Sequence, residues 1–105
     1  MKTYFEIFSE LKLNKTQFVE VVLVAARGST PANAGARALV GASGLLYGTV
    51  GGGKVEAKAI AHASKMLAAS DRAAQIDFTI WNLQTDVGMT CGGEVKFYFE
   101  VHNHN

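Results

Sequence analysis

The hydrophobic positions in the first half of the chain change their spacing from a helical period to a strand period. Apolar residues recur every three or four positions over residues 3–13, which predicts a helix. A nearly continuous, valine-rich run over residues 17–26 is typical of a strand buried on both faces. Two short apolar segments, 36–41 and 45–50, flank a Gly-containing turn and predict a hairpin.

The second half of the chain begins with another predicted helix, which two strands follow. Residues 55–70 carry an alanine-rich apolar stripe at helical spacing, which suits close packing on a sheet. Strict alternation predicts strands over residues 75–81 and 94–101, with a loop over 84–93 between them. The apolar residues that share one face of the first of these strands are Ile76, Phe78 and Ile80.

These elements predict an α/β or α+β fold. We expect a single-layer mixed β-sheet of about five strands, with an N-terminal helix and one main helix packed on it. The 105 residues suffice for one domain, spanning residues 1–105, with one hydrophobic core.

Composition excludes several classes of protein. Hydrophobic residues make up 49% and charged residues 18%, which excludes a disordered tail. A net charge of +1 argues against a general nucleic-acid or membrane-surface binder, and the apolar runs are too short to span a bilayer. The single cysteine, Cys91, excludes an intrachain disulfide and favours a cytoplasmic protein.

The strongest local feature is Gly51-Gly52-Gly53, which stands between a predicted strand and a predicted helix. Backbone N–H groups at such a helix start form a natural anion cradle, and Lys54 would add a positive charge. A tight turn without a ligand explains the spacing equally well. The G-x-x-x-x-G-K pattern of a P-loop is also present, but Val55 follows it instead of the hydroxyl residue that holds Mg²⁺.

Cys91 lies in a glycine-containing loop and is followed by Gly92. Nearby N–H groups favour a thiolate, which makes Cys91 a candidate soft-metal ligand or persulfide carrier. An inert, packed thiol is the commoner outcome for a single cysteine.

Three further polar residues could bind an anion. Ser29 and Thr30 can donate hydrogen bonds to phosphate, and Arg37 can pair with phosphate in a bidentate manner. The alternative is a turn with local hydroxyl bonds and a surface arginine. His102 and His104 are spaced to touch one metal ion, although a frayed tail is the favoured interpretation.

Three glycine-rich blocks occur in a fixed order along the chain. They are Gly28-Ser29-Thr30-Pro31 with Gly35-Ala36, then Gly48 to Glu56, then Asp86 to Gly93 followed by a strand. The sequence over roughly residues 15–101 resembles the N-terminal domain of the XdhC/CoxI family, accessory proteins of xanthine dehydrogenase and related molybdenum hydroxylases.

The resemblance implies an accessory protein that binds molybdenum cofactor transiently and helps its sulfuration and insertion into a hydroxylase such as xanthine dehydrogenase. It implies a chaperone and not a catalyst. Cys91 would be the molybdenum contact. The cofactor-binding residues that we expect on this basis are Ser29, Thr30, Arg37, Gly51, Gly52, Gly53, Lys54, Cys91 and Gly92.

Two departures from the family pattern qualify the resemblance. Ala32 stands where the family usually has arginine, and Arg37 is the candidate substitute. The C-terminal Rossmann-like domain of the family is absent from residues 1–105, which implies a separate chain or a reduced role.

Several partners and two other functions stay open. The partners implied are the hydroxylase, a cysteine desulfurase, and a second copy or a separate Rossmann-domain chain; no nucleic acid and no membrane is expected. The alternative functions are a sulfurtransferase that uses a Cys91 persulfide, and a docking module for the hydroxylase with no ligand of its own.

Overall fold

The elements follow the order predicted from the sequence. The computed structural model describes residues 1–28, 30, 32–69, 75–90 and 92–103. The elements are α1 (Tyr4–Leu13), β1 (Phe18–Gly28), β2 (Arg37–Gly41), β3 (Gly44–Gly48), α2 (Gly53–Ala69), β4 (Ile76–Asn82) and β5 (Gly93–His102). The predicted bounds are confirmed to within two residues at each end.

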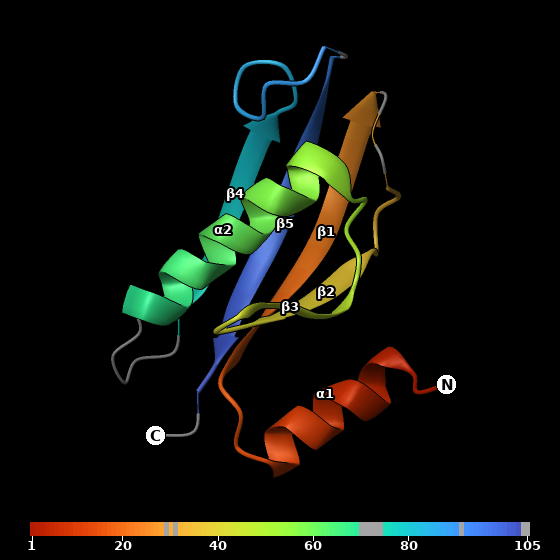
Figure 1. Ribbon diagram of the computed structural model, residues 1–105. Coiled ribbons are helices and arrows are strands. Elements are labelled where there is room, and N and C mark those ends of the chain that lie inside the picture. Colours follow the sequence, from red (N-terminus) through yellow and green to blue (C-terminus); the bar gives the residue numbers. More distant parts are fainter. Residues whose placement is uncertain (29, 31, 70–74, 91, 104–105) are drawn as a thin grey trace.

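The described residues form one five-stranded sheet in the order β3-β2-β1-β5-β4 (Figure 1). The predicted fold class is confirmed, since an N-terminal helix and one main helix accompany this sheet. The expectation of a mixed sheet is corrected, because all four strand pairings are antiparallel. The strands β3 and β4, joined through α2, run in the same direction but lie at opposite edges, so they never pair.

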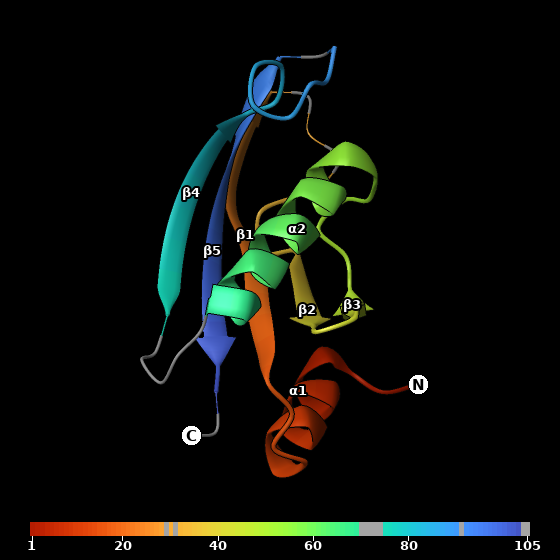
Figure 2. The same ribbon diagram turned by 60° about the vertical axis from the view of Figure 1, so that its left-hand side comes forward.

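Helix α2 covers one face of the sheet, and the core lies beneath it (Figure 2). Alternate residues of β1 and β5 point toward the helix, and small side chains on α2 let it approach closely. The buried residues of these three elements are Val19, Val21, Leu23, Val55, Ala59, Ala63, Met66, Val95, Phe97, Phe99 and Val101. Among the described residues, no helix has both the length and the apolarity that a membrane span requires.

The described residues cover the other sheet face, called the outer face here, only at one end. Helix α1 packs there, with the ring of Phe8 5.3 Å from that of Phe18. Further along β1, Val24 is 45% exposed. The expectation that β1 is buried on both faces therefore holds only near its start, because α1 is too short to cover the whole strand.

Strand β4 turns its apolar side chains to the outer face. Ile76, Phe78 and Ile80 share one face as the alternation predicts, and each is at least half exposed. The intervening residues face α2: the Asp77 carboxylate lies 2.7 Å from His62, and Trp81 lies beneath the Lys58 ammonium. Alternation thus identifies the two faces of this edge strand correctly, but α2 covers the more polar one.

Candidate functional site

The first and third glycine blocks meet at the end of β1. Gly28 is the last residue of β1 and pairs with Gly93, the first residue of β5. A Cβ atom added at Gly28 would lie 2.8 Å from the Cα of Gly93, and the φ angle of Gly28 is +85°. The two blocks therefore pack backbone against backbone, at an approach that only glycine allows.

The second block joins them through the start of α2. The ammonium of Lys54, on the first turn of the helix, donates a hydrogen bond of 3.0 Å to the carbonyl oxygen of Gly88. Figure 1 shows the first turn of α2, the end of β1 and the loop before β5 at the same end of the sheet. We call this region, formed by Gly28, Lys54, Gly88, Gly92 and Gly93, the glycine end.

The turn before α2 is closed by a carboxylate of the chain itself. Oε1 of Glu56 accepts hydrogen bonds from the backbone nitrogens of Val50 and Gly52 at 2.9 and 3.1 Å, and from the Thr49 hydroxyl at 2.5 Å. The nitrogen of Gly51 donates to Thr49 Oγ1. Partial burial raises the pKa of Glu56, but the hydrogen bonds together outweigh it and hold the pKa below its ordinary value. Part of the expected anion cradle is therefore already occupied by Glu56.

Space for a ligand remains beside this turn. A Cβ atom added at Gly52 or Gly53 would meet no atom within 4 Å, so another molecule can approach the backbone closely there. An open pocket of about 260 Å³ is lined by Lys54, Gly88, Met89 and Thr90. That volume lies just below the range of about 300–1,000 Å³ typical of small-molecule sites. The pocket would therefore hold one end of a larger ligand.

Arg37 does not belong to the glycine end. Its guanidinium lies 3.3 Å from Oε2 of Glu20 and 5.7 Å from the ring centre of Tyr4, on the outer face. The expectation that Arg37 substitutes for the family's arginine is therefore not supported, because the side chain is engaged elsewhere.

The remaining predicted residues divide into described and undescribed ones. The Thr30 hydroxyl donates to the carbonyl oxygen of Ala32 at 3.0 Å, as expected for a local turn. Gly92 belongs to the glycine end, and its carbonyl oxygen faces Gly28. Ser29 and Cys91 lie outside the described residues, so their predicted roles stay predictions.

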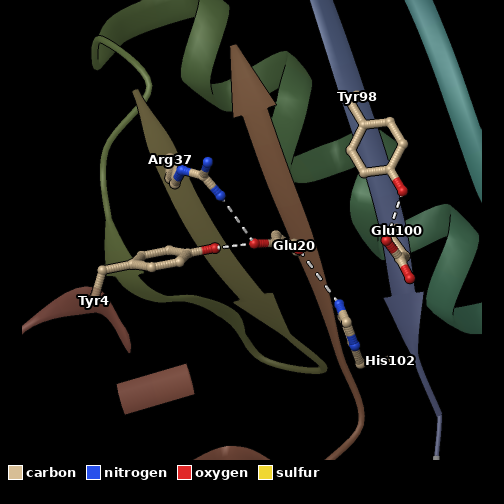
Figure 3. Close-up of polar contacts among 6 residues, drawn as sticks. All are labelled: Tyr4, Glu20, Arg37, Tyr98, Glu100 and His102. Atoms are coloured by element: carbon tan, nitrogen blue, oxygen red, sulfur yellow. Dashed lines mark hydrogen bonds and ion pairs between the residues drawn. The ribbon is translucent and has the colours of Figure 1, made fainter. Parts of the chain in front are cut away.

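A second polar group lies on the outer face (Figure 3), and of its members the sequence pointed only to His102. Glu20 of β1 and Glu100 of β5 are paired directly across the two strands, and His102 follows on β5. One carboxylate oxygen of each glutamate and a ring nitrogen of His102 all lie within 4.8 Å of one another. We call these three residues the Glu/Glu/His cluster. The available signal was Glu20 itself, a charged residue inside the otherwise apolar run over residues 18–26.

Two tyrosines donate hydrogen bonds to this cluster. The Tyr4 hydroxyl, on α1, lies 2.7 Å from Oε2 of Glu20, and the Tyr98 hydroxyl lies 2.5 Å from Oε1 of Glu100. Burial and the bond to Glu20 raise the pKa of Tyr4, while the bond to Glu100 raises the pKa of Tyr98 to about 12. Both hydroxyls therefore remain protonated donors at neutral pH.

His102 is the end of a well-formed strand and not a frayed tail. Its imidazole stacks on Phe18 at 4.8 Å and contacts the ring of Phe8 edge-on at 5.0 Å. Its side chain is 12% exposed. The interpretation of this position as a frayed end is wrong, because α1 folds over it.

Comparison with known proteins adds two findings. The family model described as "XdhC and CoxI family" matches residues 12–78. The Escherichia coli (strain K12) protein named "Uncharacterized protein YqeB" is 34% identical over an alignment of 99 residues that covers 91% of this chain. The matched region is 18% of that relative, so the chain spans less than a fifth of its length.

Proposed function

The chain belongs to the XdhC and CoxI family, and we propose that it binds molybdenum cofactor during the maturation of a molybdenum hydroxylase such as xanthine dehydrogenase. The observation that carries this proposal is the meeting of all three glycine-rich blocks at the glycine end. There the second and third blocks line one open pocket, and the backbone of Gly52 and Gly53 is accessible to a ligand. Such an arrangement suits a ligand that is held briefly and then passed on.

The chemistry of the cofactor fits this site in part. Its phosphate is anionic, and the Lys54 ammonium at the pocket supplies a matching positive charge. Glu56 is negatively charged beside the turn, so we expect the phosphate to lie on the Lys54 side. The pocket of about 260 Å³ would take only one end of the cofactor, and the remainder would lie over the glycine surface.

Cys91 is proposed as the soft ligand for the molybdenum end. It directly follows Thr90, which lines the pocket, and thiolate sulfur suits a soft metal. In this proposal the protein's residues hold and orient the cofactor and carry out no covalent step. Sulfuration would be supplied by a partner such as a cysteine desulfurase.

The test is an anaerobic titration of the protein with molybdenum cofactor. The two readouts are the amount of bound molybdenum and the melting temperature of the protein. We expect a rise in melting temperature, because a ligand that binds only the folded state stabilises it. Replacing Lys54 with alanine should weaken binding about tenfold through loss of a charge-assisted contact. Lys58→Ala is the matched control, because Lys58 lies one turn further along α2 over the Trp81 ring.

Two more variants separate the roles of the third block. Gly92→Ala should fold normally, because its φ is outside the left-handed region and an added Cβ meets no atom within 4 Å. A loss of binding in this variant would report close approach of the ligand to the backbone. Weaker binding by Cys91→Ser would support a sulfur contact, whereas equal binding would leave Cys91 without that role.

Two outcomes would favour the other functions. If neither the wild type nor any variant binds the cofactor, the proposal is wrong and a docking module for the hydroxylase remains. If Cys91→Ser loses persulfide sulfur transfer while cofactor binding persists, a sulfurtransferase is favoured.

A further inference from the structure

Two negatively charged side chains face each other on the outer face of the sheet. Glu20 and Glu100 occupy directly opposite positions on the antiparallel strands β1 and β5. Like charges at such positions destabilise a sheet, and the Glu20 side chain is only 14% exposed, so water screens it poorly. This arrangement calls for a compensating positive charge between the two strands.

Among the described residues, Arg37 is the one permanently charged cation in an ion pair with either carboxylate. Arg37 Nη1 and the Tyr4 hydroxyl both approach Oε2 of Glu20, and the Tyr98 hydroxyl donates to Oε1 of Glu100. These contacts use one oxygen of each carboxylate and fix its orientation. Within the described part of the chain, no hydrogen bond is donated to the other oxygen of either carboxylate.

His102 presents a nitrogen to the same place. Its Nε2 atom is buried and makes no hydrogen bond with any part of the chain that the structure describes. It lies 3.5 Å from Oε1 of Glu20, which is long for a hydrogen bond. Two ligands bound about 2.1 Å from one tetrahedral metal ion lie about 3.4 Å apart, so this spacing suits two ligands of one ion.

We propose that Glu20, Glu100 and His102 bind one divalent transition-metal ion, with Zn²⁺ as the ion that fits best. One imidazole nitrogen with two carboxylate oxygens is a ligand set that zinc accepts, whereas Ca²⁺ and Mg²⁺ prefer oxygen ligands alone. The stacked rings of Phe18 and Phe8 hold the imidazole, and Tyr4, Tyr98 and Arg37 orient the carboxylates.

This site is separate from the glycine end. Gly28 lies eight positions after Glu20 on β1, which corresponds to about 26 Å along an extended strand. The ion would cross-link β1 to β5 beneath α1. The inference therefore does not rest on the proposed cofactor binding, and either can fail without the other.

The experiment is a calorimetric titration of the 105-residue chain with ZnCl₂, in a background carrying Cys91→Ser and His104→Ala. Cys91 and His104 lie outside the described residues and have side chains that bind zinc. The two changes therefore remove competing ligands. We expect one zinc ion per chain and a rise in melting temperature. Titration with Co²⁺ reports the same site through its visible absorption, and Mg²⁺ should not compete.

Single substitutions within the cluster decide the proposal. Glu100→Gln keeps an acceptor for Tyr98 but loses the charge, and His102→Gln loses the imidazole; each should weaken zinc binding at least about tenfold. His62→Gln is the matched control, since His62 pairs with Asp77 on the other face and belongs to no three-ligand group among the described residues. Circular dichroism confirms folding, and if His102→Gln unfolds, Glu100→Gln decides alone. Absence of zinc binding, or unchanged binding in a folded cluster variant, would overturn the proposal.

Discussion

Oε1 of Glu56 lies 3.1 Å from the backbone nitrogen of Gly52, so the turn that leads into α2 is closed by a side chain of that helix. A carboxylate at this place satisfies N–H groups that would otherwise lack partners, and it interacts favourably with the positive end of the helix dipole. The glycine turn thus has a structural role that is independent of any ligand.

The first prediction concerns the charge of Glu56. Replacing Glu56 with Gln should lower the free energy of unfolding at pH 7 by about 1 kcal/mol. Because the pKa of Glu56 is below its ordinary value of 4.5 in the folded state, this stabilisation is present above that pH and is lost as pH falls through the folded pKa. Urea unfolding at pH 7 and pH 3 measures the difference between wild type and variant.

The control for this prediction is Glu10→Gln. Glu10 pairs with Lys2 on the exposed side of α1, and such surface pairs contribute little. An equal loss of stability in Glu56→Gln at both pH values would contradict a role for the charge.

The second prediction concerns the end of the β2–β3 hairpin. Gly48 has a φ of +85°, and an added Cβ would lie 2.3 Å from the carbonyl oxygen of Arg37. Gly48→Ala should therefore reduce stability by at least about 2 kcal/mol through backbone strain and steric conflict. Gly92→Ala meets neither obstacle and should stay within about 0.5 kcal/mol of wild type in the same unfolding experiment.

The third prediction concerns the attachment of α1. Phe8 packs against Phe18 and His102, whereas Phe5, on the same helix, is 67% exposed. Phe8→Ala should lower the free energy of unfolding by about 2 kcal/mol, since it removes a half-buried aromatic side chain. Phe5→Ala should lower the free energy of unfolding by less than about 0.5 kcal/mol. Thermal unfolding of the two variants compares them directly, and equal losses would mean that α1 does not pack as described.

The fourth prediction concerns the ionisation of Tyr98. Its hydrogen bond to Glu100 raises its pKa to about 12, so this contact stabilises the protein fully below the ordinary tyrosine value of 10.0. That stabilisation is lost as pH rises through 12. An ultraviolet titration that follows tyrosinate absorption should show the ionisation of Tyr98 near pH 12. The same ionisation should be missing in Tyr98→Phe, which assigns it to this residue.

Glu100→Gln tests the cause of this shift. Without the negative carboxylate, the pKa of Tyr98 should fall toward its ordinary value. An unchanged titration in this variant would show that Glu100 is not responsible.

The helices and strands of this fold can be predicted from the sequence because the patterns that indicate them are local. The spacing of apolar residues along α2 and along β5 depends only on which side of each element is buried, and these bounds were predicted to within two residues. The order of the three glycine blocks also indicated the family that the family model matches over residues 12–78.

The candidate sites depended on contacts that the sequence does not encode locally. The sequence predicted that Arg37 binds an anion, but in the structure its guanidinium pairs with Glu20. The sequence also predicted an open turn at Gly51–Gly53, but the Glu56 carboxylate accepts hydrogen bonds from that turn. Both partners lie close in sequence or on a neighbouring strand, but spacing alone does not say which way a side chain turns.

By itself, the sequence determined the elements, their order and the glycine-rich segments, because helix and strand periods and glycine's backbone freedom act over a few residues. Only the tertiary structure decided that α2 packs on the Asp77 and Trp81 face of β4, so that Ile76, Phe78 and Ile80 on the opposite face stay exposed. It also brought Glu20 opposite Glu100 and folded α1 over His102. These relationships follow from strand register and from the packing of distant elements. A shift of one residue in the register of a strand moves each of its side chains to the opposite face of the sheet.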